Sequence, residues 1–283
     1  MKIVIASGKG GVGKSMVTSS LALLLSKTKK IVACDCDVDA PNLGLWLGIK
    51  DYDKKQKIST SFKAEINQKK CTKCGKCFEV CKFKAITRND LFSINPFLCE
   101  GCGACEIVCP EKAIKLKKVK NAEIRIKKTE YGFPLISAQL YPGESGSGKI
   151  VEELRKKTEE FDYEIMLLDA PAGIGCPVIA SVRECDFAVL VTEPTPSGFS
   201  DLKRILEIVN YFKITYGIVI NKWTINQKLS KKIQDWSKEK FLGKIPYDKK
   251  VIEAIVNLRP IIYYDKKIES LFLEILNEIK KRL

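Results

Sequence analysis

The sequence predicts an α/β fold built on a parallel β-sheet and interrupted by a small α+β insert. Three observations predict it: apolar strand-like runs alternate with helical patterns, a glycine-rich loop joins the first strand to the first helix, and eight of the twelve cysteines lie between residues 71 and 109. Because the alternation stops near residue 50 and resumes after 119, we expect a domain in two pieces, 1–58 and 120–283, around an insert at 59–119.

Hydrophobic periodicity gives the expected elements in chain order. The predicted strands are 2–6, 31–34, 124–127, 133–140, 165–169, 187–192 and 217–221. The predicted helices are 16–26, 146–159, 198–210, 226–239, 248–257 and 266–282. Parallel strands end at one edge of a sheet, and the last three predicted strands each end in a polar residue, so we expect a site at that edge.

Composition excludes several classes of chemistry. The chain has 283 residues and no histidine, which excludes Ser-His-Asp triads, Cys-His pairs and histidine metal sites. Its formal net charge of +15 comes mostly from lysines spread along the chain, whereas base recognition favours arginine. The amphipathic C-terminal helix is expected to close its own domain rather than bind a bilayer. We therefore expect neither a nucleic-acid partner nor a membrane partner.

The beginning of the chain bears on its compartment. The glycine-rich loop follows the first strand at once and leaves no room for a signal peptide, and no apolar run approaches the length of a membrane span. We therefore expect a cytoplasmic protein. Clustered cysteines in that compartment are more often metal ligands than disulfides.

The glycine-rich loop carries a phosphate-binding pattern. Residues 8–15 read Gly-Lys-Gly-Gly-Val-Gly-Lys-Ser and match G-x-x-x-x-G-K-[ST] between a strand and a helix. The glycines let backbone N–H groups converge on phosphates, and the helix N-terminus adds positive potential. We expect Lys14 to contact the β- and γ-phosphates and the Ser15 hydroxyl to bind Mg²⁺. The loop therefore predicts a P-loop NTPase domain.

The additional Lys9 makes the loop resemble the deviant Walker A motif of the MinD/ParA-type ATPases. In that family the early lysine reaches the phosphates of the partner subunit, which implies a homodimer or a heterodimer with a paralogue. The resemblance implies that Lys9, Lys14 and Asp37 are catalytic and that Asp37, rather than its neighbour Asp39, orients the attacking water. Hydrolysis of this kind proceeds by positioning and charge stabilisation and needs no histidine.

Two later stretches extend the resemblance. Leu168 to Gly173 is similar to the family's switch II, which implies that Asp169 supports Mg²⁺ together with Ser15 and Asp37. Asn221 and Lys222 resemble the base-recognition region. The residues expected to bind ATP or ADP are Gly8, Lys9, Gly10, Gly11, Val12, Gly13, Lys14, Ser15, Met16 and Asn221.

The insert contains an internal repeat with the pattern C-x2-C-x2-C-x3-C, displaced by 28 residues. It resembles a bacterial-type ferredoxin with two 4Fe–4S clusters, in which the fourth cysteine of each run ligates the other cluster. Zinc sites more often use C-x2-C pairs set a dozen or more residues apart. The implied ligands are Cys71, Cys74, Cys77 and Cys109 for the first cluster, and Cys99, Cys102, Cys105 and Cys81 for the second.

Cys176 lies seven residues after Asp169, the spacing at which the nitrogenase iron protein of the same family places a cluster ligand. The segment that would supply a second such cysteine, 143–149, contains none. Two readings stay open for Cys176: an auxiliary metal or cluster ligand, or a structural residue near a dimer contact.

These features together predict an Mg²⁺-dependent ATPase that is also an iron–sulfur protein. The leading expectation is that nucleotide-driven dimer changes are coupled to electron transfer toward a partner redox protein. One alternative is an assembly or carrier ATPase that delivers iron–sulfur clusters or metal to a client protein. Another is a spatial or regulatory ATPase whose clusters sense redox state.

Overall fold

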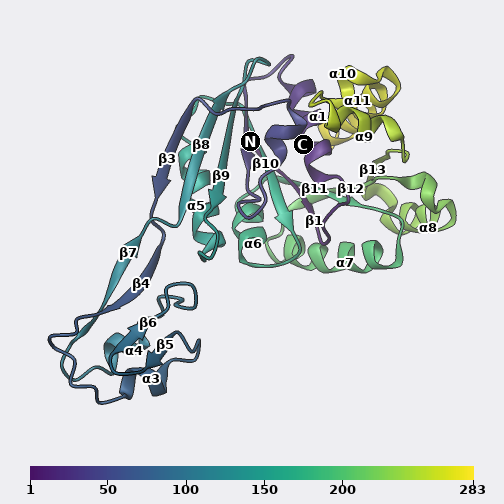
Figure 1. The fold of residues 1–283 in the computed structure, drawn as a ribbon. Coiled ribbons are helices and arrows are strands. Elements are labelled where there is room, and N and C mark those ends of the chain that lie inside the picture. Colours follow the sequence, from purple (N-terminus) through teal and green to yellow (C-terminus); the bar gives the residue numbers. More distant parts are fainter. The chain divides into compact units, whose positions relative to one another are not determined.

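The computed structural model describes residues 1–283, which divide into two compact units. The first unit comprises Met1–Lys55, Ile124–Gln139 and Ser147–Leu283. The second comprises Gln56–Glu123 and Leu140–Gly146. The second unit contains the cysteine-rich repeat, and the first contains the glycine-rich loop (Figure 1).

The central sheet has nine strands in the order β13-β12-β11-β1-β10-β2-β9-β8-β3. Every pairing from β13 to β9 is parallel. The predicted α/β fold with a mostly parallel sheet is therefore confirmed. The strands are β1 (Lys2–Ser7), β2 (Ile31–Asp35), β3 (Lys54–Ile58), β8 (Ala122–Lys128), β9 (Pro134–Leu140), β10 (Ile165–Ala172), β11 (Phe187–Thr192), β12 (Thr215–Ile220) and β13 (Phe241–Lys244).

Helices lie on both faces of the parallel strands (Figure 1). Side chains fix several helix starts: Thr195 accepts a hydrogen bond from the Gly198 N–H at the start of α7, and Asp265 accepts two at the start of α11. The helices are α1 (Lys14–Leu25), α2 (Leu43–Trp46), α5 (Ser147–Thr158), α6 (Cys176–Val182), α7 (Pro196–Tyr211), α8 (Gln227–Ser237), α9 (Lys249–Val256), α10 (Ile261–Tyr264) and α11 (Lys266–Lys280), with 3-10 turns at Trp223–Ile225 and Lys238–Lys240.

The core of the first unit follows the two periodicities of its elements. Alternate residues of the buried strands, such as Ile3 and Ile5 of β1, face one core cluster together with α1. The C-terminal helix α11 buries Phe272 and Ile275 in the same cluster, so its apolar face packs within the unit. No helix is both long enough and apolar enough to cross a membrane.

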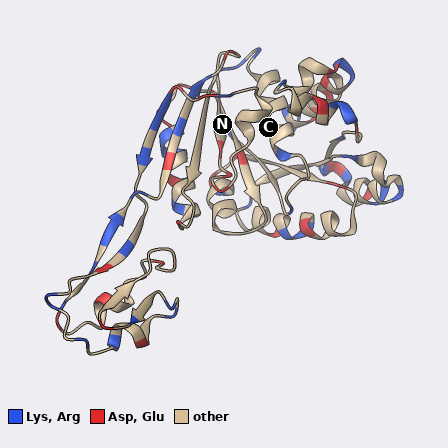
Figure 2. Ribbon diagram, in the orientation of Figure 1, with Lys and Arg blue, Asp and Glu red and all other residues tan.

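The second unit is built from two antiparallel strand pairs and two short helices. Strand β4 (Ser61–Ile66) pairs with β7 (Ile114–Val119), and β5 (Ile86–Arg88) pairs with β6 (Phe92–Ile94). The helices are α3 (Lys76–Val80) and α4 (Ala104–Ile107). Lysines and arginines occur on both units (Figure 2).

Helix α6 is not predicted from the sequence. The residues before it include Gly173 and Gly175, and Pro177 follows at its start, so the stretch has the composition of a turn. Proline is tolerated in the first turn of a helix because the N–H group that it lacks has no partner there. Hydrophobic periodicity therefore does not predict this short helix, which has a proline in its first turn.

Candidate functional site

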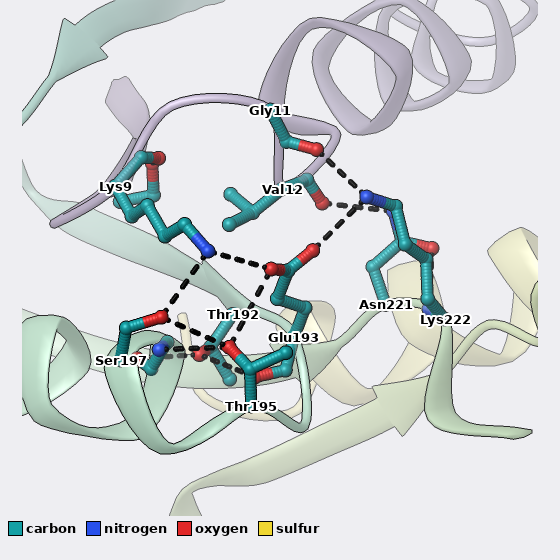
Figure 3. A network of polar contacts seen from close by, with 11 residues as sticks. Lys9, Gly11, Val12, Thr192, Glu193, Thr195, Ser197, Asn221 and Lys222 are labelled. Atoms are coloured by element: carbon teal, nitrogen blue, oxygen red, sulfur yellow. Dashed lines mark hydrogen bonds and ion pairs between the residues drawn. The ribbon is translucent and has the colours of Figure 1, made fainter. Parts of the chain in front are cut away.

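Five parallel strands end at one edge of the sheet and carry the candidate site. The glycine-rich loop follows β1, and Asp169 lies near the end of β10. Asp35 ends β2, while Glu193 and Asn221 directly follow β11 and β12. Side chains from distant parts of the sequence therefore meet around one loop (Figure 3).

The loop conformation depends on glycine at two positions. Gly13 has φ +95°, and a Cβ atom there would lie 2.3 Å from Asn221 Nδ2. A Cβ atom on Gly8 would lie 2.0 Å from the backbone oxygen of Asp201. The Asn221 side chain donates a hydrogen bond to the Val12 carbonyl at 2.8 Å, so β12 holds the loop in place.

Lys14 and Ser15 begin α1 and meet Asp169 beneath the loop. The Thr18 hydroxyl donates to Asp169 Oδ1 at 2.7 Å. Burial raises the pKa of Asp169 to about 6, although Lys14, Ser15 and Thr18 oppose the shift. Asp169 Oδ2 is buried and has no hydrogen-bond partner. Such an oxygen fits a ligand of a cation, or an acceptor for a cation-bound water.

The environment of Lys14 is suited to an anion. Its side chain is only 7% exposed, and burial lowers its pKa although Asp169, Asp37 and Asp35 oppose the shift. A buried ammonium that is charged at neutral pH is stabilised by a nearby negative group, and phosphate oxygens would supply one. Lys14 therefore lies close enough to Asp169, Asp37 and Asp35 to interact with their charges.

Asp37 and Asp39 differ in their surroundings. Asp37 is half-buried, accepts a hydrogen bond from the Ala40 N–H at 3.3 Å, and has a pKa raised by burial. Asp39 is exposed. Asp35, which sequence reasoning did not select, is fully buried and accepts the Leu43 N–H at 3.0 Å. Burial and the Asp169 charge raise its pKa well above the usual value.

Lys9, Glu193 and Lys222 form an ion-pair network beside the glycine-rich loop (Figure 3). Lys9 Nζ contacts Glu193 Oε1 at 2.9 Å and donates to Ser197 Oγ at 3.2 Å. Lys222 Nζ contacts Glu193 Oε2 at 3.0 Å and donates to the Gly11 carbonyl at 2.9 Å. Burial raises the pKa of Glu193, but the two lysines outweigh it and the net shift is downward. Glu193 is thus an ionised carboxylate between two ammonium groups.

Besides Asp35, sequence reasoning missed Glu193 and Thr18. Glu193 directly follows a predicted strand, so its place at the sheet edge was available as a signal, but its pairing with Lys9 spans 184 positions and could not be read locally. Thr18 lies one turn after Lys14 on the same helix, where residues four apart share a face. The i, i+4 spacing would have placed its hydroxyl beside the site.

The other predicted loop residues occupy the same turn. Gly10 and Gly11 are exposed at its tip, and Val12 and Met16 are buried beneath it. A side chain on Gly11, which has φ +75°, would meet nothing within 4 Å. The tip is therefore open to a ligand. A direct contact between Asn221 and nucleotide stays a prediction, because its amide is bonded to the loop and to the Lys222 N–H.

The second unit brings cysteines of both runs of the repeat together. The four thiols predicted for the second cluster, Cys81, Cys99, Cys102 and Cys105, line one hollow of the second unit. Apolar side chains such as Ile86 and Leu116 complete its wall. Of the thiols predicted for the first cluster, Cys77 is buried in the core of the second unit, and Cys71 and Cys109 pack against that core.

The 28-residue repeat reappears in the backbone. Gly75 and Gly103 both have positive φ at the starts of α3 and α4, and Lys84 and Lys112 both adopt φ near +50° (51° and 48°). After these lysines the next N–H groups, at Ala85 and Ala113, each donate to a cysteine sulfur at 3.3 Å. No three Cys, Asp or Glu side chains in the structure are grouped as ligands of a single metal ion.

The remaining cysteines are divided between core and surface. Cys34, Cys36 and Cys185 are buried, and the Cys34 and Cys36 sulfurs lie 3.6 Å apart. Cys176 is exposed at the first residue of α6. A Cβ atom on Gly148 would lie 3.2 Å from the Cys176 Cβ, so α5 approaches this cysteine closely.

Comparisons with known proteins agree with this geometry. The family described as the CobQ/CobB/MinD/ParA nucleotide binding domain matches residues 3–261. An uncharacterized protein of Methanocaldococcus jannaschii is 47% identical over 226 residues, which cover 80% of this chain and 79% of the relative. A protein of the same organism named iron-sulfur cluster carrier protein is 26% identical over 300 residues, covering 100% of this chain and 84% of the relative.

A solved structure gives the same fold. The septum site-determining protein MinD of Pyrococcus horikoshii, complexed with Mg-ADP, superposes with a TM-score of 0.62 and 19% identity, covering 99% of this chain and 96% of that one. The ATP-binding, P-loop NTPase character predicted from the glycine-rich loop is confirmed by these matches. On this basis the chain belongs to the CobQ/CobB/MinD/ParA nucleotide-binding family.

Proposed function

We propose that this chain is an Mg²⁺-dependent ATPase whose second unit holds two 4Fe–4S clusters and whose nucleotide state controls electron transfer to a partner redox protein. The observation that carries the proposal is the hollow lined by Cys81, Cys99, Cys102 and Cys105. These are the four thiols that ferredoxin spacing assigns to one cluster, and they come from both runs of the repeat: Cys81 belongs to the first run and the other three to the second.

The donor set of the second unit fits such clusters. Single ions gather their ligands tightly, at about 2.3 Å from metal to sulfur for zinc, whereas a cluster with iron at several corners spreads its thiolates around a larger volume. Cys99 is buried and accepts the Ala64 N–H at 3.4 Å, and Cys81 and Cys109 accept backbone N–H groups as well. Hydrogen bonds to sulfur tune cluster potentials. When bound, each cluster supplies one-electron redox chemistry that these side chains lack.

The first unit supplies the nucleotide chemistry. The loop N–H groups and Lys14 would bind the phosphates. The Ser15 hydroxyl and Asp169, whose Oδ2 has no hydrogen-bond partner, would hold Mg²⁺. Asp37 accepts a hydrogen bond from the attacking water and orients it toward the γ-phosphate. Lys9 contacts the nucleotide of a second copy, or of a paralogue, in a dimer.

A carrier function is the second candidate. The relative named iron-sulfur cluster carrier protein favours it, and the exposed Cys176 offers a thiol outside the cysteine repeat. Transferable clusters need exposed ligands that can exchange, whereas only Cys74 and Cys102 of the eight predicted ligands are exposed and the others are partly or fully buried. Burial of these ligands favours retained clusters and therefore electron transfer.

Reduction potentials measured with different nucleotides test the proposal. The anaerobically purified protein is titrated with ADP and with a non-hydrolysable ATP analogue while cluster EPR is followed. We expect potentials that change between the two nucleotides, and a Lys14→Ala variant that keeps the EPR signal but loses the change. Constant potentials combined with cluster loss to an apo-acceptor protein would favour the carrier function. Absence of any cluster signal would contradict both.

A further inference from the structure

Glu193 occupies the position that an anionic ligand of Lys9 and Lys222 would take. Its two carboxylate oxygens contact the two ammonium groups at 2.9 and 3.0 Å, one oxygen for each lysine. The Glu193 side chain is buried, with 11% exposure, while that of Lys9 is 37% exposed. A buried carboxylate between two cations mimics a phosphate group, which also accepts hydrogen bonds from lysine through several oxygens.

Both lysines are within reach of the phosphate-binding loop. Lys222 Nζ donates to the Gly11 carbonyl at the exposed tip, and Lys9 belongs to the loop itself. A polyphosphate seated on the loop therefore brings negative charge into the space around Glu193. Like charges at close range repel, and the repulsion is stronger where the carboxylate is shielded from water.

We infer that Glu193 is a built-in competitor of the nucleotide phosphates: it holds Lys9 and Lys222 when the site is empty and is displaced from Lys9 when a nucleoside triphosphate binds. The inference rests on nucleotide binding at this loop, and its consequence for a partner subunit rests on the proposed dimer. Lys9 directed toward Glu193 and Ser197 within its own chain is not free to contact a second copy. Displacement of Glu193 thus sets the concentration of ATP at which Lys9 becomes available.

Removal of the competing charge tests the inference. We expect Glu193→Gln to bind ATP with Mg²⁺ about tenfold more tightly than the wild type, since two ion pairs of partly buried groups no longer oppose binding. Affinity is measured by calorimetry, and folding is checked by circular dichroism. Glu159→Gln is the matched control, because Glu159 pairs with Lys2 at 2.6 Å on the surface and the same charge is removed away from the loop.

Two further variants test whether the gain depends on Lys9 and cover the case in which Glu193→Gln does not fold. In a Lys9→Gln background the gain from Glu193→Gln should shrink, because one of the two competing pairs is already absent. If Glu193→Gln does not fold, Glu193→Asp keeps the charge but is too short to bridge both lysines, and a smaller gain is expected. Wild type that binds ATP while Glu193→Gln binds it equally or more weakly would overturn the inference. Wild type that binds no ATP would instead contradict the proposed function.

Discussion

Substitution of Gly13 by alanine probes how the loop is held. At φ +95° a left-handed alanine costs about 1–2 kcal/mol relative to glycine. The new Cβ would also lie 2.3 Å from Asn221 Nδ2, which must move by about 1 Å to reach ordinary van der Waals contact at 3.4 Å. That movement breaks the 2.8 Å hydrogen bond to the Val12 carbonyl and adds about 1–3 kcal/mol. The expected loss of unfolding free energy is therefore about 2–5 kcal/mol.

Gly132 provides the matched control. It has φ +84°, and a Cβ atom there would meet nothing within 4 Å, so Gly132→Ala carries the backbone strain without the clash. Urea unfolding should give a loss of about 1–2 kcal/mol for this variant. Because Lys14 and Ser15 follow Gly13 directly, ATP affinity should also fall about tenfold or more in Gly13→Ala alone. Equal stability losses for the two variants, or unchanged ATP affinity in Gly13→Ala, would refute the described role of Asn221 and Gly13.

Three other expectations follow from named contacts. The pKa of Asp169 is raised to about 6, so the folded chain binds this proton more tightly than the unfolded chain. The free energy of unfolding should therefore fall as the pH rises from 3.8 to 6. In urea unfolding without Mg²⁺, the fall should be smaller for Asp169→Asn than for the wild type. Cys99→Ala should lose about half of the bound iron by metal analysis, while Cys185→Ala, equally buried but outside the repeat, should retain it. Arg155 donates to two backbone carbonyls at 2.5 and 2.7 Å, so Arg155→Met should lower the free energy of unfolding, measured by thermal denaturation, by about 2–3 kcal/mol. The surface variant Lys156→Met should change it by less than about 1 kcal/mol.

Local patterns in the sequence predict the parallel sheet and the loop well. The strand expected at 187–192 has these bounds in the structure, because a continuous apolar run bounded by polar residues indicates a buried parallel strand. Helix α1 begins at Lys14 rather than at residue 16, since the loop glycines lead directly into its first turn. Such features depend on residues adjacent in the chain.

Contacts between distant segments could not be predicted in this way. The pairing of Glu193 with Lys9 and Lys222 depends on the order of β11, β1 and β12 in the sheet, which periodicity does not give. Similarly, the segment Leu140–Gly146 belongs to the second unit although the sequence assigns it to the α/β piece. The Ser145 carbonyl in this segment accepts a hydrogen bond from Asn121 at 3.0 Å, and no local sequence pattern predicts this contact.

Iron and acid-labile sulfide in the anaerobically purified protein provide the most direct test of the second unit. Two complete cysteine sets should bind about eight irons and eight sulfides per chain. A protein with the cysteines of one set changed to serine should bind about four of each. Zinc in stoichiometric amount, or a fully folded chain without iron and sulfide after reconstitution, would contradict the assignment of this unit as a two-cluster iron–sulfur domain.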